Sequence, residues 1–418
     1  MPNTLFAVGS NCPSCAAVDT LARLTPDKPQ IFVRLEGNPL ITGTRYVAPV
    51  TRCPLCLERF YSPVPESIKK APKYDVSCGT SLAIGRYYLG LPMYRMEQSQ
   101  SMQGIPVQDS TQWDILKKMH LVVSPAFNAL TELAGNGSLM MYDDTTGRII
   151  ENKVKGLATH TTAFISVVNG HKVHLFLTGR EVAGENASRI LEQRTSEEPV
   201  IAMMDASAHN IPKRLQYSML GRFILCFCLV HGRRKFFEVF NFFDKECDFV
   251  LQIISQVYAH DNYCKQQKCT ASERLLYHQK HSQGLMQTLY AWLNNQLLYE
   301  HTESNGGLGV AVRYMLRHWE PLTTFLRVAG APLDSNWAER AIKIAIRHRR
   351  NSLFYRTTHG ALVGDCLMSL IYTAQENHIN PYDYLNALQR HPEAVQASPK
   401  DWLPWNYTQA LANRTQAA

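Results

Sequence analysis

Three acidic residues occupy positions where a carboxylate could serve phosphoryl chemistry. Asp143 and Asp205 each follow an apolar segment, "GSLMMY" and "PVIAMM", and Glu339 lies near the start of "NWAERAIKIAIRHRR". Attack on a phosphodiester needs an activated water or hydroxyl and a stabilised leaving oxygen, and two Mg2+ ions about 4 Å apart supply both. Hard divalent ions prefer carboxylate oxygens and take only a few from protein. We therefore expect Asp143, Asp205 and Glu339 to be catalytic and to bind two Mg2+ (or Mn2+) ions.

Each of these acids also has a structural interpretation. Asp143 and Asp144 precede "TTG", so either could be a turn residue, and Asp205 could cap a helix that opens at "ASAHN". Glu339 lies three residues after Asn336, as in a capping box, and four before Lys343, as in a helical ion pair. Taken singly, the structural interpretation is favoured for each acid. The order of the predicted strands favours the catalytic one for the set.

The elements that would position these acids form one predicted sheet. "GSLMMYD" predicts a first strand, and "HTTAFISVVNGHKVHLFLTG" predicts two more that are joined by the turn Asn169-Gly170. "AGENASRILEQR" is helical, and "PVIAMMDA" and "FILCFCLV" predict a fourth and a fifth strand. This is the order of a ribonuclease H-like mixed α/β domain. Its first and fourth strands are neighbours, which would bring Asp143 and Asp205 together, and a helix crossing the sheet could add Glu339.

Two Cys-x-x-Cys pairs predict a zinc ribbon near the N-terminus. "CPSC" and "CPLC" flank short strand-like segments, and two such turns complete a tetrahedral site of four thiolates. The predicted ligands of one structural Zn2+ are Cys12, Cys15, Cys53 and Cys56. The alternatives are four reduced cysteines without metal, or redox-active pairs.

The segments around the sheet divide the chain into four predicted parts. They are a zinc ribbon at 1–66, a helical DNA-binding domain at 67–134, a catalytic core at 135–358 with a helical insertion at about 236–330, and C-terminal helices with a tail at 359–418. In the second part, "MYRMEQSQSM" and "VQDSTQWDILKKM" have helix-turn-helix spacing, with a plain helical hairpin as the alternative. The tail "SPKDWLPWNYTQALANRTQAA" is expected to be extended.

Composition restricts the class of protein. The chain has 418 residues, 45% hydrophobic and 19% charged, which is typical of a soluble globular protein. A net charge of +8 suits a polyanionic partner. The longest apolar run, "FILCFCLV", is far shorter than the roughly 20 residues of a membrane span, and we expect neither a membrane segment nor a signal peptide. Eleven cysteines, four of them in Cys-x-x-Cys pairs, favour a reducing cytoplasm.

Basic residues follow two of the predicted site elements. They are Arg233, Arg234 and Lys235 after the fifth strand, and Arg340, Lys343, Arg347 and Arg350 along the helix of Glu339. Contacts to DNA phosphates are plausible for both sets, and a solvated helix face is the alternative. Asn336 is expected to start that helix.

Cys228 and His231 close the fifth strand. A second zinc site would need two more ligands, and none is found at ligand spacing in the sequence. A buried Cys and His pair is therefore favoured over metal binding. His231 could still order the active site or contact DNA.

Several segments resemble the insertion sequence 66 family of DDE transposases, over about Cys12 to Trp405. They are "LPMYR", "YDDTT", "CLVHGRRKFF", "LDSNWAERAIKIAIRHRRNSLF", "GALVGDCLMSLIYTAQENHINPYDYLNAL" and "LPWNY". The resemblance implies a ribonuclease H-like core with an Asp-Asp-Glu triad and Mg2+. Asp143 matches the first acid of the triad, and the adjacent Asp144 is the alternative match. Asp205 and Glu339 match the second and third acids.

The resemblance also implies an activity. Such a protein would bind terminal inverted repeats, cleave the 3′ ends of a mobile element and join them to target DNA. It would act as a homodimer or larger assembly on DNA, in the bacterial cytoplasm at the nucleoid. Two other functions stay open, a catalytically inactive DNA-binding protein that keeps the fold and a structure-specific DNA nuclease on the same core.

Overall fold

The computed structural model describes residues 40–213, 221–298 and 302–417. Contacts between residues divide the chain into two units, Met1–Pro39 and Leu40–Ala418, and all elements given below belong to the second. Cys12 and Cys15 of the predicted zinc ribbon lie outside the described residues. In the described ranges, every helix is too short or too polar to cross a lipid bilayer.

A five-stranded mixed sheet forms the centre of the described chain. Its order is β5-β4-β3-β6-β7, with β4 antiparallel to β3 and β5, and β6 parallel to β3 and β7. The strands are β3 (Leu139–Thr146), β4 (His160–Val168), β5 (His171–Gly179), β6 (Val200–Met204) and β7 (Phe223–Phe227). Asn169 and Gly170 form the predicted turn, with φ of 51° and 82°. The predicted strand order is confirmed, and the sheet is consistent with a ribonuclease H-like core.

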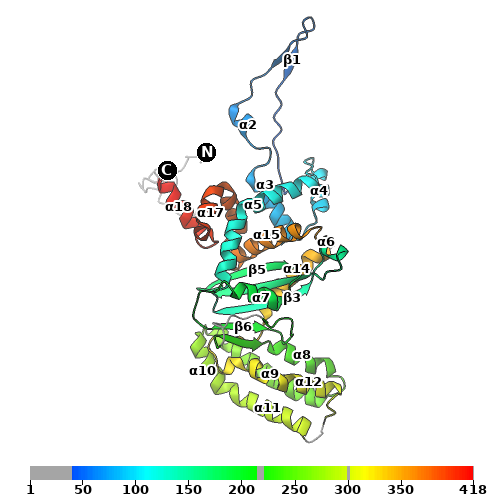
Figure 1. Cartoon of the computed structure of the whole chain (residues 1–418), viewed down its shortest axis with the longest axis vertical. Coiled ribbons are helices and arrows are strands. Elements are labelled where there is room, and N and C mark those ends of the chain that lie inside the picture. The colour runs from blue at the N-terminus through cyan, green and yellow to red at the C-terminus, as the bar shows by residue number, and fades with distance from the viewer. Residues whose placement is uncertain (1–39, 214–220, 299–301, 418) are drawn as a thin grey trace, which may run out of the picture. The chain divides into compact units, whose positions relative to one another are not determined.

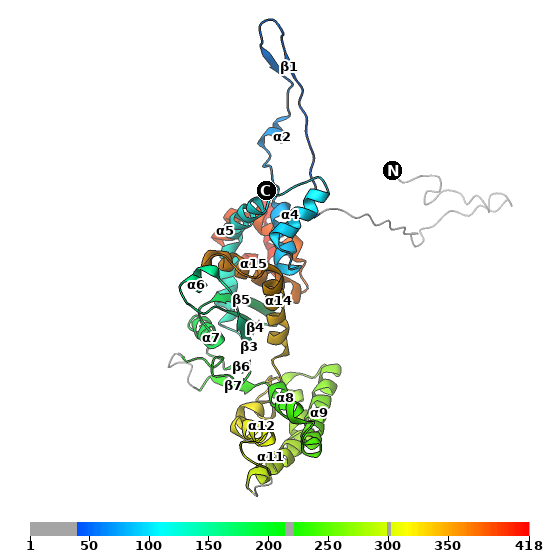
Figure 2. The same cartoon turned by 90° about the vertical axis from the view of Figure 1, so that its right-hand side faces the viewer.

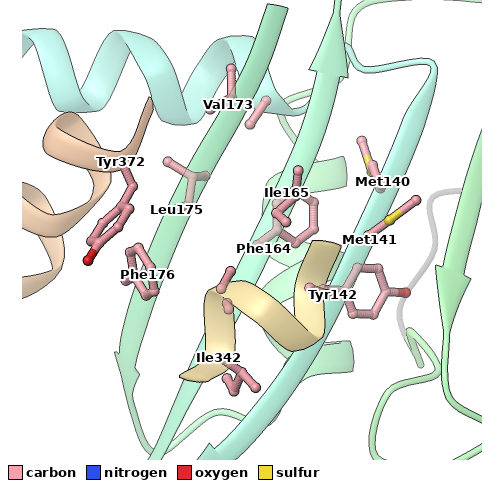
Figure 3. Packing of buried hydrophobic residues seen from close by; sticks show 14 of the residues in the cluster. Met140, Met141, Tyr142, Phe164, Ile165, Val173, Leu175, Phe176, Ile342 and Tyr372 are labelled. Carbon is pink, nitrogen blue, oxygen red and sulfur yellow. The ribbon is translucent and has the colours of Figure 1, made fainter. Parts of the chain in front are cut away.

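Helices pack on the sheet and complete its core. α5 (Asp109–Ala134) and α7 (Ala183–Leu191) contact β4, and α14 (Asn336–Ser352) contacts β3 and β4. The short α6 (Ile150–Val154) lies between β3 and β4 in the chain. Figure 3 shows Ile342 of α14 packed against the strands and Tyr372 beside Phe176, whose ring centroids are 5.7 Å apart. These contacts fix α14, the helix of Glu339, to the sheet.

Helix α15 (Thr358–Glu376) covers the free edge of β5. Alternate backbone N–H groups of β5 donate to side chains spaced four residues apart on or just after α15. The pairs are Lys172 with Asn377 (3.1 Å), His174 with Thr373 (3.0 Å), Phe176 with Ser369 (2.9 Å) and Thr178 with Asp365 (2.6 Å). The helix therefore satisfies the donors of an edge strand that would otherwise be open to another chain.

The segment between β7 and α14 is helical. It comprises α8 (Leu229–Val239), α9 (Asp244–Gln266), α10 (Ala271–His281), α11 (Gln283–Leu298), α12 (Gly307–Arg317), α13 (Trp319–Leu322) and the 3-10 turn η4 (Thr324–Leu326). These helices gather beyond β6 and β7 (Figure 1; Figure 2). The buried Asp261 of α9 pairs with Arg274 of α10 at 2.5 Å, which joins the two helices, and with Lys265 of α9 itself at 2.7 Å.

The residues before the sheet form a hairpin and a group of helices. The elements are β1 (Val50–Arg52), β2 (Arg59–Tyr61), α2 (Glu66–Lys70), α3 (Val76–Ala83), the π-helical turn η2 (Ile84–Tyr88) and α4 (Met93–Met102). Helices α4 and α5 flank a turn at Gly104. Helix α5 continues to Ala134 and contacts β4, β5, α7 and α15, so it also belongs to the core around the sheet.

The C-terminal residues are helical to the end of the described chain. After α16 (Pro381–Arg390) come α17 (Pro392–Ala397), the 3-10 turn η5 (Pro399–Trp402) and α18 (Tyr407–Ala417). The prediction of an extended tail was wrong, because Trp402 and Leu403 are buried and the hydroxyl of Tyr384 donates to the Trp402 carbonyl at 2.9 Å. Apolar side chains hold this segment against the core.

Candidate active site

Asp143 and Asp144 lie within β3, and adjacent residues of a strand point to opposite faces of the sheet. The Asp144 carboxylate accepts the N–H of Ala183, the first residue of α7, at 3.2 Å. Thr145, on the same face as Asp143, bonds to Arg349 of α14 at 3.2 Å. Asp143 thus faces the α14 side and Asp144 the α7 side. The turn interpretation of Asp143 was wrong, because the strand continues to Thr146.

Asp143 lies in β3, and Asp205 directly follows β6, the parallel neighbour of β3. The last residue pair between β3 and β6 is Met141 with Met203. Asp143 lies two residues after Met141, and Asp205 lies two residues after Met203. Asp205 is followed by a turn, where its Oδ1 accepts the Ser207 N–H at 3.0 Å and the amide of Asn210. The helix-cap interpretation of Asp205 was therefore wrong. The charge of Asp205 acts on Asp143, so the two carboxylates lie near each other.

The environment of Asp143 disfavours its charge. Burial raises the pKa of Asp143 to about 6, and the charges of Asp205 and Asp144 act in the same direction. The Asp144 backbone N–H and the Asn210 side chain oppose this rise. Two partly buried acids that repel each other favour either protonation or a bound cation. Oxygen donors of this kind fit Mg2+.

Glu339 lies in the first turn of α14, which begins at Asn336 as predicted. Its backbone N–H donates to the carbonyl of Ser335 at 3.0 Å, and Ser335 is the N-cap residue without a side-chain capping bond. The capping-box interpretation was therefore wrong. In the described part of the chain, Glu339 forms no ion pair with Lys343, and its Oε1 is buried without a hydrogen-bond partner. A cation at this oxygen would satisfy it.

The donor atoms of Cys228, His231 and Glu339 lie within 4.8 Å of one another. Over the ranges that the structure describes, Asp143, Asp205 and Glu339 do not form such a group. Cys228 is the N-cap residue of α8 and His231 lies in its first turn. The sequence did not indicate this grouping, because Glu339 lies on α14, which follows Cys228 and His231 in the chain only after the whole helical insertion.

Cys228 joins the three chain segments around these acids. Its N–H donates to the carbonyl of Met204, the residue before Asp205, at 2.9 Å. Its Sγ accepts the N–H of Ser335, the cap of the Glu339 helix, at 3.5 Å. The next residue, Leu229, donates to the carbonyl of Leu333 at 2.9 Å. The end of β6 and the starts of α8 and α14 are therefore fixed to one another.

The negative charges of Asp205 and Glu339 both affect the pKa of His231. The Cys228 side chain raises the pKa of His231, the two carboxylates raise it further, and partial burial opposes them. His231 therefore lies near both Asp205 and Glu339.

The predicted DNA-binding residues are mostly exposed. Arg233, Arg234, Arg340, Lys343, Arg347 and Arg350 are exposed, and Lys235 is half-buried with its Nζ 5.9 Å from the ring centroid of Tyr314. Arg347 also has a structural contact, since its guanidinium donates to the carbonyl of Tyr88 at 2.6 Å and to the hydroxyl of Tyr372 at 3.1 Å.

Arg349 is a positioning residue that sequence reasoning missed. Its Nη1 donates to the Thr145 hydroxyl at 3.2 Å, to the Thr146 hydroxyl at 2.8 Å and to the Thr146 carbonyl. These bonds tie the last turn of α14 to the end of β3, two residues beyond Asp143. No sequence signal separated Arg349 from its basic neighbours.

Cys53 and Cys56, the described half of the predicted zinc site, lie in the turn between β1 and β2. The N–H groups of Cys56 and Leu55 and the Cys56 side chain lower the pKa of Cys53. The turn is closed by the Cys53 N–H, which donates to the Glu58 carbonyl at 2.9 Å. Backbone donors that favour a thiolate suit a metal ligand.

Comparison with known proteins identifies related sequences. A family model described as "Transposase IS66 family" matches residues 74–362. The uncharacterized protein y4jD of Sinorhizobium fredii (strain NBRC 101917 / NGR234) is 32% identical over 190 residues, 44% of this chain and 36% of that protein. The uncharacterized protein y4qI of the same organism is 23% identical over 338 residues, 78% and 61% of the two chains. The chain thus spans less than two thirds of the length of these relatives.

Proposed function

The chain belongs to the IS66 family of transposases, and on this premise we propose that Asp143, Asp205 and Glu339 form a catalytic centre that cuts and joins DNA. The observation that carries this proposal is the placement of Asp143 in β3 and of Asp205 directly after the adjacent parallel strand β6, with the charge of Asp205 acting on Asp143. The buried, unpartnered Oε1 of Glu339 adds a third oxygen donor. When two Mg2+ (or Mn2+) ions are bound by these residues, they supply charge stabilisation for in-line displacement at phosphorus.

The surrounding residues position the three carboxylates. Asn210 and the Ser207 N–H orient Asp205. The Cys228 thiol and Arg349 hold opposite ends of α14, so the position of Glu339 relative to β3 is restrained at both ends. Preorganisation of this kind reduces the rearrangement needed when DNA binds.

The proposed reaction has two stages on one site. A water first releases a 3′ hydroxyl at the end of the mobile element, and that hydroxyl then attacks target DNA. The exposed basic residues of α8 and α14 contact the phosphate backbone. Helices α3, α4 and α5 and the β1–β2 hairpin read the terminal repeats. The protein acts in the bacterial cytoplasm as a dimer or larger assembly that holds two DNA ends.

We also propose that Cys12, Cys15, Cys53 and Cys56 bind one structural Zn2+. The support is the doubled Cys-x-x-Cys pattern, the hairpin turn that carries Cys53 and Cys56, and the lowered pKa of Cys53. The measurement is the zinc content of the purified chain, which should fall by one equivalent in Cys53→Ser. An unchanged content would contradict the proposal.

The test of the proposed activity is strand transfer by the full chain on repeat-ended DNA with Mg2+. Asp143→Ala, Asp205→Ala and Glu339→Ala should each abolish cleavage and joining, and a gel shift should show that each variant still binds DNA. Retention of DNA by the unmodified chain without metal-dependent cleavage would instead indicate a DNA-binding protein. Structure-dependent cutting without joining would indicate a nuclease.

A further inference from the structure

The group formed by Cys228, His231 and Glu339 has the composition of a metal site. Its three donor atoms lie within 4.8 Å of one another, and Cys228 is fully buried. His231 Nδ1 and Glu339 Oε1 are buried and have no hydrogen-bond partner. Because unpartnered buried polar atoms are costly, two of them beside a buried thiol point to a ligand that the three share.

The ligand chemistry distinguishes this group from the aspartate pair. One sulfur, one imidazole nitrogen and one carboxylate suit Zn2+, which is often held by three protein ligands with an open fourth position. Mg2+ prefers oxygen donors throughout. Donors around a tetrahedral Zn2+ lie about 3.5 Å apart, so modest rotation of the His231 and Glu339 side chains would close the group on the ion.

We propose that Cys228, His231 and Glu339 form a second metal site that is selective for Zn2+ or a similarly thiophilic ion. Glu339 is shared with the proposed catalytic centre, so an ion in this site withdraws Glu339 from Mg2+ and inhibits the reaction. The metal site stands on its own geometry, whereas the inhibition rests on the proposed function.

The backbone around this group is held in place before any ion binds. Cys228 caps α8 and is bonded to the carbonyl of Met204, and its sulfur accepts the N–H of Ser335 at the start of α14. His231 lies in the first turn of α8, so the Cys-x-x-His spacing presents both ligands at one helix end. Only side-chain rotation is left to complete the site.

The binding test is a titration of the metal-free full chain with Co2+, read by thiolate-to-cobalt absorption. Cys228→Ser keeps a hydrogen-bond acceptor for the Ser335 N–H but removes the sulfur ligand. Cys226→Ser is the matched control, because Cys226 is equally buried but lies outside the group. The unmodified chain and the control should bind one more equivalent than Cys228→Ser. The zinc ribbon contributes equally to all three.

His231→Gln is a second variant that leaves the thiol in place, and it should also lose this equivalent or bind it at least about tenfold more weakly. Circular dichroism establishes that each variant is folded. If folded Cys228→Ser and His231→Gln both bind as much Co2+ as the unmodified chain, and as tightly, the proposed site does not exist.

The inhibition test adds Zn2+ to the Mg2+-dependent cleavage reaction, with each protein compared with its own zinc-free activity. Zn2+ should inhibit cleavage by the unmodified chain and by Cys226→Ser, and excess Mg2+ should relieve this inhibition. Cys228→Ser should require at least about tenfold more Zn2+ for the same degree of inhibition. Equal inhibition of all three proteins, or none, would overturn the shared role of Glu339. If no protein cleaves DNA even without zinc, the proposed function fails, whereas the cobalt titration still decides the metal site.

Discussion

Asp143 in β3 and Asp205 directly after the parallel strand β6 each lie two residues beyond the paired residues Met141 and Met203. Parallel neighbours at one level present their side chains to the same face of the sheet. Two carboxylates are therefore close together in a partly buried place, and burial raises the pKa of Asp143 to about 6. An ionised Asp143 in this place lowers the stability of the folded protein, and perturbed pKa values of this kind are common in functional sites.

Removal of the Asp143 charge should stabilise the metal-free protein. At pH 7.5 the folded chain holds an ionised Asp143 whose pKa is raised, so Asp143→Asn should increase the free energy of unfolding by about 1 to 2 kcal/mol. Urea denaturation without added Mg2+ measures this. Added Mg2+ should stabilise the unmodified protein and have a weaker effect on the variant.

The matched control for that experiment is Asp144→Asn. The Asp144 carboxylate faces α7 and accepts the N–H of Ala183, so its charge is compensated. We expect Asp144→Asn to leave stability unchanged or to lower it. Equal stabilisation by both substitutions would mean that Asp143 has no special repulsion from Asp205.

Asp365 should make stability fall as pH rises. Burial raises its pKa to about 7, and hydrogen bonds from Thr178 oppose this. Between about pH 4 and pH 7 the unfolded chain releases this proton while the folded chain keeps it. The contribution is thus fully present below the unfolded pKa and is lost as pH rises through the folded value, by about 2 to 4 kcal/mol.

Asp365→Asn should remove that pH dependence. The Asn oxygen can accept the Thr178 N–H and its amide can donate to the Thr178 hydroxyl, so the edge of β5 stays covered. Urea denaturation between pH 4 and pH 8 should give the variant a flatter stability profile than the unmodified protein. Superimposable profiles would show that folding does not raise the pKa of Asp365.

Arg349 and Arg350 are adjacent, but we expect them to differ in their contribution to the free energy of unfolding. Arg349→Ala removes the bonds from α14 to Thr145 and Thr146 and should lower the free energy of unfolding by about 1 to 3 kcal/mol. Arg350 is exposed, so Arg350→Ala should change it by less than about 0.5 kcal/mol. Denaturant unfolding compares the two directly. Equal effects would contradict a positioning role for Arg349.

Arg350 and Lys343 should instead contribute to DNA affinity. Each is exposed on α14, and loss of one phosphate contact reduces the slope of log affinity against log salt by about 1. Binding of a short duplex to Lys343→Ala and Arg350→Ala over a range of salt concentrations measures this slope. Lys400→Ala, an exposed lysine outside α14, is the control, and a slope change equal to that control would refute the contact.

The strand order could be predicted because each strand is a short apolar segment with a clear end. The Asn169-Gly170 turn and the acids after "LMMY" and "VIAMM" are patterns of neighbouring residues, and such patterns do not depend on tertiary contacts. The register of β3 with β6 then placed Asp143 beside Asp205. The role of α15 was not predictable in this way, because polar residues four apart within an apolar helix do not indicate that they cover the edge of β5.

The meeting of Cys228 with Glu339 could not be predicted from spacing. More than a hundred residues separate them, most of them in the helical insertion, and only tertiary packing brings α8 and α14 together. The same holds for Arg349, whose partners Thr145 and Thr146 lie on β3. Composition made all the basic residues of α14 look alike, and their different roles depend on which face of the helix each occupies.

The most direct test of the catalytic centre is Mg2+-dependent cleavage of repeat-ended DNA by conservative variants at equal DNA occupancy. Asp143→Asn, Asp205→Asn and Glu339→Gln keep size and remove one negative charge each, and Asp144→Asn does the same on the opposite face of β3. We expect loss of cleavage by at least about a hundredfold in the first three variants and retained cleavage in the fourth. Retained cleavage in any of the first three, or a loss confined to Asp144→Asn, would contradict the assignment of the catalytic centre to Asp143, Asp205 and Glu339.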